Sequence, residues 1–257
     1  YPVLVFGGTG TGKSVTVQAL LDSTPDNILT TTLNFSSATS SPGLQDMLES
    51  RLEKRQRNNY GPSGSKAKLI AFIDDLNMPK KEAEGGCQPP IQLLRQFMDY
   101  RFWYDRVKKT QKVIMDTQIV AAMGPPGGSR SMISPQLQSM FSAFNFPQSS
   151  DGTLKRIFGI MIQNHILDFD ESVKPLGPIM TQATVDMYKQ VANDFLPTPA
   201  KCHYLFNMRD IAKVFQGIMQ SKRRSFDTRE SMMRLWVHEC LRVFSDRLVD
   251  DSDREKY

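Results

Sequence analysis

The sequence predicts an α/β domain built on a parallel sheet, followed by a smaller all-helical domain. Short, wholly apolar runs such as Val3–Phe6 and Leu69–Ile73 are typical of strands that are buried on both faces, the pattern of a parallel sheet. Segments with helical spacing separate these runs, and towards the carboxyl terminus only helical spacing is left. We therefore place a large α/β domain at residues 1–168 and a helical domain at residues 169–257.

The strands and helices are expected to alternate through the large domain. Strands are predicted at residues 3–6, 28–35, 69–73, 117–123 and 144–146. Helices are predicted at residues 14–21, from 41 to about 52, 90–100, from 134 onward and 153–166. A loop is predicted at residues 56–65 and a hairpin at 102–115. In the second domain, helices are predicted at 183–195, 208–219 and 231–248, after a linker at 174–178.

The composition is that of an ordinary globular protein. Hydrophobic residues make up 40% of the chain, and 32 Lys and Arg against 27 Asp and Glu give a formal charge of +5. The basic residues are scattered among acidic ones, so no nucleic-acid partner is expected. No apolar run reaches the roughly 18 residues that a membrane-spanning helix needs, so no membrane partner is expected either.

The cysteines and histidines point to no metal site. Neither set has the short spacing of a zinc site, and three widely separated cysteines fit a reduced, cytosolic setting. These residues are Cys87, Cys202, Cys240, His165, His203 and His238. We therefore interpret the histidines as structural.

The amino-terminal residues lead directly into the first strand. Tyr1 and Pro2 precede that strand and a glycine loop follows it, an arrangement unlike a signal peptide. We expect that a segment covering an adenine base would lie before residue 1.

A glycine-rich loop after the first strand carries the strongest chemical signal. Its residues are Gly7, Gly8, Thr9, Gly10, Thr11, Gly12, Lys13 and Ser14. The order GxxxxGK[ST] between a buried strand and a helix is that of a phosphate-binding loop (P-loop). Glycines let successive backbone N–H groups point at phosphate oxygens, Lys13 would bridge the outer phosphates, and Ser14 would place its hydroxyl on Mg²⁺.

Two acids end the third predicted strand, where a Walker B element is expected. Asp74 would hold Mg²⁺ through water, and Asp75 occupies the place of the acid that orients the attacking water. That acid is usually a glutamate, so Asp75 is one methylene short. Either it still polarises water at a lower rate, or the site binds nucleotide with little hydrolysis. The alternative is a solvated turn at the end of a strand.

The end of the fourth strand lacks a polar side chain. Gly124 stands where a sensor residue commonly contacts the terminal phosphate, and it cannot make that contact. This agrees with Asp75 in predicting retained binding and weakened catalysis.

Several arginines are candidate site residues. Arg209 begins a helix of the second domain, with Asn207 as its N-cap, where it could reach a nucleotide phosphate; a solvent-facing arginine is the alternative. Arg130 and the Arg223–Arg224 pair are interpreted as solvated charges.

Several motifs together resemble the axonemal dynein heavy chains. The segments that carry this resemblance are 7–14, 72–79, 121–128, 204–210, 214–217, 234–240 and 242–248. They look like the third of the six AAA+ modules of these chains, in particular the inner-arm heavy chain 2 type. The resemblance covers nearly the whole sequence.

The resemblance implies a fold, a ligand and partners. It implies a five-stranded parallel sheet in the order 5-1-4-3-2, a helical lid, and ATP or ADP with Mg²⁺. Lys13, Ser14, Asp74, Asp75 and Arg209 would take the roles described above. The third module of dyneins is a regulatory gate, its partners are the neighbouring AAA+ modules, and microtubules are bound elsewhere in the heavy chain. The implied location is the cytoskeleton of the ciliary axoneme.

One departure from the family concerns the helix after the Gly-Pro-Pro-Gly-Gly loop. The family often has arginines there, whereas this chain has Gln136, Gln138 and Met140. A finger that acts on a neighbouring site is therefore not expected from this helix.

Three functions follow from these patterns. The first is a regulatory nucleotide-binding segment of a motor, with slow hydrolysis. The second is a self-sufficient P-loop ATPase, kinase or GTPase, although the helical lid argues against a kinase and no Asn-Lys-x-Asp guanine motif occurs. The third is a structural segment that has lost its nucleotide.

Overall fold

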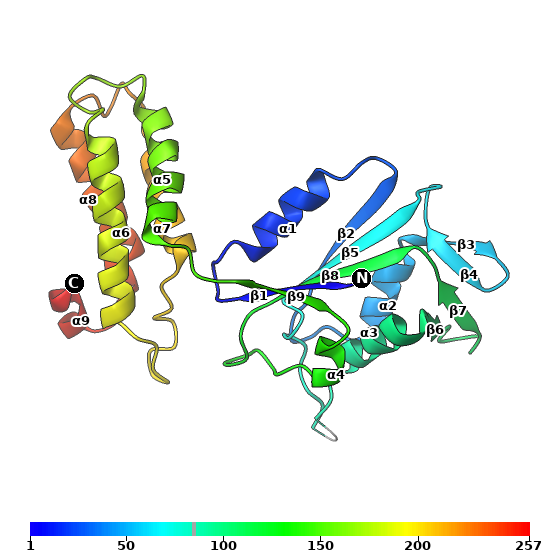
Figure 1. Cartoon of the computed structure of the whole chain (residues 1–257). Helices are drawn as coiled ribbons and strands as arrows, with labels where there is room; N and C mark the ends of the chain where they lie inside the picture. Colours follow the sequence, from blue (N-terminus) through cyan, green and yellow to red (C-terminus); the bar gives the residue numbers. More distant parts are fainter. Residues whose placement is uncertain (84–85) are drawn as a thin grey trace. The chain divides into compact units, whose positions relative to one another are not determined.

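Five parallel strands form the central sheet in the computed structural model, which describes residues 1–83 and 86–257 (Figure 1). These strands are β1 (Val3–Gly7), β2 (Ile28–Asn34), β5 (Lys68–Asp74), β8 (Thr117–Met123) and β9 (Ser142–Phe146). They lie in the order β2-β5-β8-β1-β9, and all neighbouring pairs are parallel. Counted along the chain within this sheet, that is the order 5-1-4-3-2. The predicted α/β class is confirmed.

Helices cover both faces of the sheet because successive strand residues point to opposite faces. Helix α1 (Lys13–Asp22) lies on one face, and α2 (Ser41–Glu49), α3 (Pro89–Tyr100) and α4 (Pro135–Gln138) lie on the other (Figure 1). On β1, Val5 packs in the cluster of α1, whereas Leu4 packs in the cluster that includes α2 and α3. The central strands β1, β5 and β8 are mostly apolar because both of their faces are covered, whereas the edge strand β9 is largely exposed.

A second, four-stranded sheet interrupts this alternation. Its order is β3-β4-β7-β6, formed by β3 (Leu52–Gln56), β4 (Asn59–Pro62), β7 (Gln111–Ile114) and β6 (Phe102–Tyr104). The antiparallel pair β6–β7 confirms the predicted hairpin. The predicted loop at 56–65 was wrong, since it contains β4, and the preceding helix ends at Glu49 instead of near Leu52. The polar composition of this segment predicted a loop because β3 is an exposed edge strand. A turn with Arg57 at φ 53° joins β3 to β4.

The second unit of the chain consists of helices around its own core. The chain divides into units Tyr1–Gln148 and Ser149–Tyr257. The helices are α5 (Asp151–Ile166), α6 (Leu176–Asp194), α7 (Met208–Met219), α8 (Arg229–Val243), the 3₁₀ helix η1 (Ser245–Arg247) and α9 (Asp251–Lys256). In the described part of the chain, no helix is long and apolar enough to cross a membrane.

Helix α5 belongs to the second unit, whereas the sequence analysis placed the boundary after it, at residues 168 and 169. Its buried residues Leu154, Phe158, Ile162 and Ile166 follow helical spacing and join the core of the second unit. The predicted linker at 174–178 is likewise partly helical, because α6 begins at Leu176. Periodicity alone predicted the helix correctly but did not indicate which core its apolar stripe joins.

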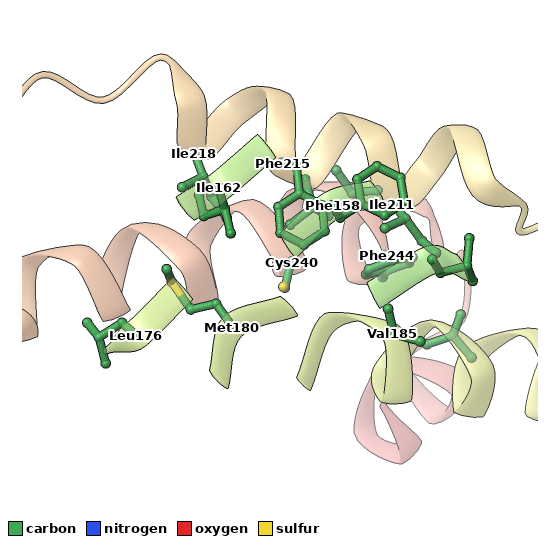
Figure 2. Close-up of a cluster of buried hydrophobic side chains, with 14 of the residues drawn as sticks. Phe158, Ile162, Leu176, Met180, Val185, Ile211, Phe215, Ile218, Cys240 and Phe244 are labelled. Carbon is green, nitrogen blue, oxygen red and sulfur yellow. The ribbon is translucent and has the colours of Figure 1, made fainter. Parts of the chain in front are cut away.

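Two stacked aromatic rings lie at the centre of this helical core (Figure 2). The rings of Phe158 and Phe215 are 4.8 Å apart and nearly parallel, and the Phe215 side chain is fully buried. Cys240 lies in the same cluster, and burial raises the pKa of its thiol to about 12. This cysteine is therefore a packing residue that stays protonated at neutral pH.

We predict that Phe215→Ala destabilises the helical unit by about 3–5 kcal/mol, because it removes a fully buried ring and leaves a cavity. The free energy of unfolding from urea titration is the measurement. Ile160→Ala on α5 is the control, because Ile160 is 54% exposed and should change stability by less than about 0.5 kcal/mol. Equal losses in the two variants would contradict this assignment of the core.

Candidate functional site

The glycine loop connects β1 to α1 and has the backbone conformations that its glycines permit. Gly10 and Gly12 have φ values of 79° and 87°, in the left-handed region that other residues rarely adopt. Gly7 is needed for a different reason: a Cβ there would lie 2.2 Å from the carbonyl oxygen of Phe146 on β9. The loop therefore depends on glycine both for its turns and for the close approach of two strands.

The side chain of Lys13 is folded into this loop. Its ammonium group donates to the carbonyl oxygens of Gly7 and Gly8, at 2.9 and 2.6 Å, and is 3.4 Å from Thr11 Oγ1. Thr11 in turn donates its hydroxyl to the Gly8 carbonyl, at 3.1 Å. The lysine residue is only 9% exposed. A buried positive charge is thus fixed at the centre of the loop.

The amino terminus of α1 is suited to an anion. Gly12 is its N-cap, so no side chain caps the first turn, and that turn contains no acidic residue. The first turn of a helix has N–H groups without intrahelical partners and a partial positive charge. Ser14, half-buried in the same turn, and the exposed Thr9 complete the loop. Lys13 adds a full positive charge to this terminus.

Asp74 and Asp75 lie at the carboxyl edge of the sheet, as the sequence predicted. Asp74 is the last residue of β5, and its backbone carbonyl accepts from the Phe35 N–H at 3.0 Å. Its carboxylate accepts from the Asp75 N–H, also at 3.0 Å. Asp75 has a φ of 54°, an uncommon conformation for a residue with a side chain. The chain therefore turns sharply between the two acids.

The strand register brings the P-loop and the acids to the same edge. Leu4 of β1 lies opposite Ala121 of β8, which lies opposite Ile73 of β5. Since all three strands are parallel, Gly7 at the end of β1 and Asp74 at the end of β5 lie at the same edge of the sheet, with β8 between the two strands. Ligands of open α/β sheets bind at this carboxyl edge.

Arg130 joins this edge, and its interpretation as a solvated charge was wrong. Its Nη2 atom lies 3.1 Å from Asp75 Oδ1 in a half-exposed ion pair. The Gly127–Arg130 turn, closed by reciprocal backbone hydrogen bonds of 3.0 Å, directs the chain back at this point. The turn residues predicted a loop here, but no local pattern indicated its distant carboxylate partner.

Asn77 is another residue of the site for which the sequence predicted no role. Its side chain is 1% exposed and donates to the Gly124 carbonyl at 2.9 Å. Its own carbonyl accepts from the Ser131 N–H at 3.0 Å. Asn77 thus connects the turn after β5 to the loop after β8. Its position three residues after Asp74 was the available signal.

The helix that follows this loop has no role in the described contacts of the site. On α4, Gln136 accepts a hydrogen bond from Arg95 of α3, and Leu137 is buried. Gln138 donates to the Ile133 carbonyl at 3.4 Å. These contacts attach α4 to its own unit.

Arg209 lies in the second unit, at the amino terminus of α7. Asn207 and Asp210 form a capping box there, in which the Asn207 side chain accepts from the Arg209 N–H at 2.9 Å. Arg209 itself is exposed. Its role in nucleotide binding stays a prediction.

The histidines take part in no metal site that the structure describes. Within residues 1–83 and 86–257, no group of three or more His, Cys, Asp or Glu side chains could hold a metal ion. His165 Nε2 lies 3.1 Å from Ser221 Oγ, and burial lowers the pKa of this histidine. The partner and the partial burial are consistent with a structural role.

The residues present fit a magnesium nucleotide. A glycine loop with a buried ammonium group and an uncapped helix terminus suits a polyphosphate. Mg²⁺ needs few protein ligands, because water and phosphate oxygens complete its coordination, so Ser14 and Asp74 stay the candidate ligands. Together with the sheet order and the following helical unit, these features define a P-loop domain of the AAA+ class with a helical lid.

Comparison with known proteins identifies the family. The family described as "P-loop containing dynein motor region" matches residues 1–149, and "Dynein heavy chain, ATPase lid domain" matches residues 162–254. The chain therefore belongs to the dynein motor-region family, as the motifs indicated.

Similar proteins include long heavy chains from distant organisms. "Dynein axonemal heavy chain 2" of Mus musculus is 51% identical over 257 residues, which is all of this chain and 6% of that protein. "Dynein-1-beta heavy chain, flagellar inner arm I1 complex" of Chlamydomonas reinhardtii is 46% identical over 98% of this chain and 6% of its own length. This chain thus spans a small part of the relatives that it matches.

We predict that Gly7→Ala destabilises the first unit by about 1–3 kcal/mol, because the new Cβ would collide with backbone atoms of Phe146. The unfolding free energy from urea titration measures this effect. Gly8→Ala in the same loop is the control, since its Cβ would meet Thr11 Cγ2 at an ordinary 3.7 Å. If Gly8→Ala were as destabilising as Gly7→Ala, close strand packing would not be the reason for the glycine.

Proposed function

We propose that this chain binds ATP or ADP with Mg²⁺ and acts as a regulatory module of an axonemal dynein motor, with slow hydrolysis. The observation that carries this proposal is the buried Lys13 ammonium group within a glycine loop, at an uncapped helix terminus. In this role, nucleotide would shift the population of ring conformations and would not itself drive the main power-producing step.

Different residues are assigned to different parts of the nucleotide. The loop from Gly7 to Gly12 offers backbone N–H groups to phosphate oxygens, and Lys13 neutralises the outer phosphates. Ser14 and Asp74 would hold Mg²⁺. Bound Mg²⁺ supplies charge neutralisation at the phosphates. For Arg209, on the helical unit, the proposed role is a contact with the phosphates.

Two features support slow hydrolysis. Asp75 has a shorter side chain than the glutamate that usually orients water, and it is engaged by Arg130. Gly124 offers no side chain to a terminal phosphate. Each feature removes a contact that stabilises the transition state of phosphoryl transfer.

The relatives supply the biological setting of the proposal. Their names refer to axonemal heavy chains and to a flagellar inner arm complex. We extend this setting to the present chain: a place in the axoneme of a cilium or flagellum, with neighbouring AAA+ modules as partners. Contact with microtubules belongs to parts of a heavy chain outside these residues.

We predict that Lys13→Ala raises the Kd for Mg-ATP and Mg-ADP by about 100-fold or more, because it removes a buried charge from the phosphates. Isothermal titration calorimetry of the purified chain measures both affinities, and circular dichroism verifies folding. Lys108→Ala is the matched control, because Lys108 is exposed and lies on another loop.

Two results would contradict the proposed function. If the folded wild-type chain binds neither nucleotide at millimolar concentration, it is a structural segment. If the chain alone turns over ATP rapidly, the regulatory role fails and a self-sufficient ATPase is favoured. A panel of ATP, GTP and small acceptors separates that outcome from a kinase or GTPase.

We predict that Asp74→Asn weakens Mg-ADP binding by about 10- to 100-fold, the range for a residue that holds a metal through another ligand. Binding of ADP in EDTA should change little, because the carboxylate acts on the metal and not on the phosphates. Calorimetry with and without Mg²⁺ measures the difference, with Asp99→Asn as an exposed control. Equal weakening under the two conditions would show that Asp74 does not act through Mg²⁺.

A further inference from the structure

Arg130 fills the space that is left by the missing side chain of Gly124. A Cβ on Gly124 would lie 2.9 Å from Arg130 Nε and 3.1 Å from Arg130 Cδ. Any larger residue at position 124 would therefore displace the arginine. Gly124 therefore has two effects: it provides no sensor side chain, and it makes room for the Arg130 guanidinium group at the end of β8.

The loop that carries Arg130 is attached to the turn that carries Asp75. Asn77 donates to Gly124 and accepts from Ser131, so it binds both ends of the loop that contains the arginine. The Leu76 N–H also donates to the Ala122 carbonyl, at 3.0 Å. The acid and the arginine thus belong to one hydrogen-bonded assembly across two strand ends.

The ion pair is the charged contact that holds this guanidinium group. Nη2 lies 3.1 Å from Asp75 Oδ1, whereas the buried Nε has no hydrogen-bond partner among the described residues. An unpartnered buried donor costs free energy, so the pairing with Asp75 offsets that cost. A carboxylate oxygen held by this ion pair is less free to turn toward a water molecule and orient it.

We propose that Arg130 is a positioning residue that restrains Asp75 through this ion pair and thereby slows ATP hydrolysis. The inference rests on the proposed function and explains the slow turnover by an interaction within the chain. Restraint by Arg130 adds to the effect of the short Asp75 side chain. Substitution of Arg130 removes the restraint and leaves the Asp75 side chain unchanged.

The test compares single-turnover ATP hydrolysis by the wild-type chain, Arg130→Gln and Arg130→Lys. Arg130→Gln should raise the rate about two- to fivefold, the population change that a half-exposed ion pair supports. Arg130→Lys keeps the charge and should stay near the wild-type rate. The gain should vanish when Asp75→Asn is combined with Arg130→Gln. Arg95→Gln, which alters an arginine that contacts α4, should leave the rate unchanged.

Thermal unfolding without nucleotide provides a second readout. Arg130→Gln and Asp75→Asn should each change the Tm, and the double variant should change it by less than the sum of the two. Additive changes would show that the pair does not form and would overturn the inference. A lower rate in Arg130→Gln would also overturn it, because the arginine would then assist hydrolysis.

The two proposals fail in different ways. If calorimetry shows no binding of Mg-ATP by the wild-type chain, the proposed function fails and the restraint on hydrolysis fails with it. If binding is normal and Arg130→Gln hydrolyses ATP at the wild-type rate, the inference alone is overturned.

Discussion

The close contact between β1 and β9 at Gly7 is the constraint on which the site depends. The glycine loop begins at this residue, and a side chain there would overlap with backbone atoms of β9. Because β1 is a central strand with partners on both sides, its end cannot move without disturbing the sheet. The loop therefore starts from a fixed position, and the left-handed glycines that follow determine where Lys13 lies. Rigid placement of this charge reduces the ordering that a bound polyphosphate would require.

The other half of the site is held by hydrogen bonds between strand ends. Asp75 departs from ordinary backbone conformation, which is sustained only when surrounding contacts determine it. Those contacts are present: Asp74 accepts the Asp75 N–H, and Asn77 joins this turn to the loop after β8. The acid and its arginine partner are consequently parts of one assembly, and a change at Gly124 would affect both.

The sequence predicted most of the fold because its signals are local. Buried parallel strands are apolar runs, and the residues of the glycine loop are contiguous, so both could be identified from short segments. The β3–β4 half of the second sheet escaped prediction because β4 is short and contains residues typical of turns. Arg130 escaped because its partner is distant in sequence, and the role of Asn77 depends on two loops meeting. The boundary was placed after α5 because periodicity shows that a helix has an apolar face but does not show which core this face joins.

The helices of the second unit are held together by a packed core. The amino terminus of α7 is closed by the capping box of Asn207 and Asp210, and α7 packs on α5 through the stacking of Phe215 on Phe158. Since these rings are fully or almost fully buried, separating α7 from α5 would open the core and would be costly. A displacement of α7 would therefore carry α5 with it, so the two helices behave as one packed body.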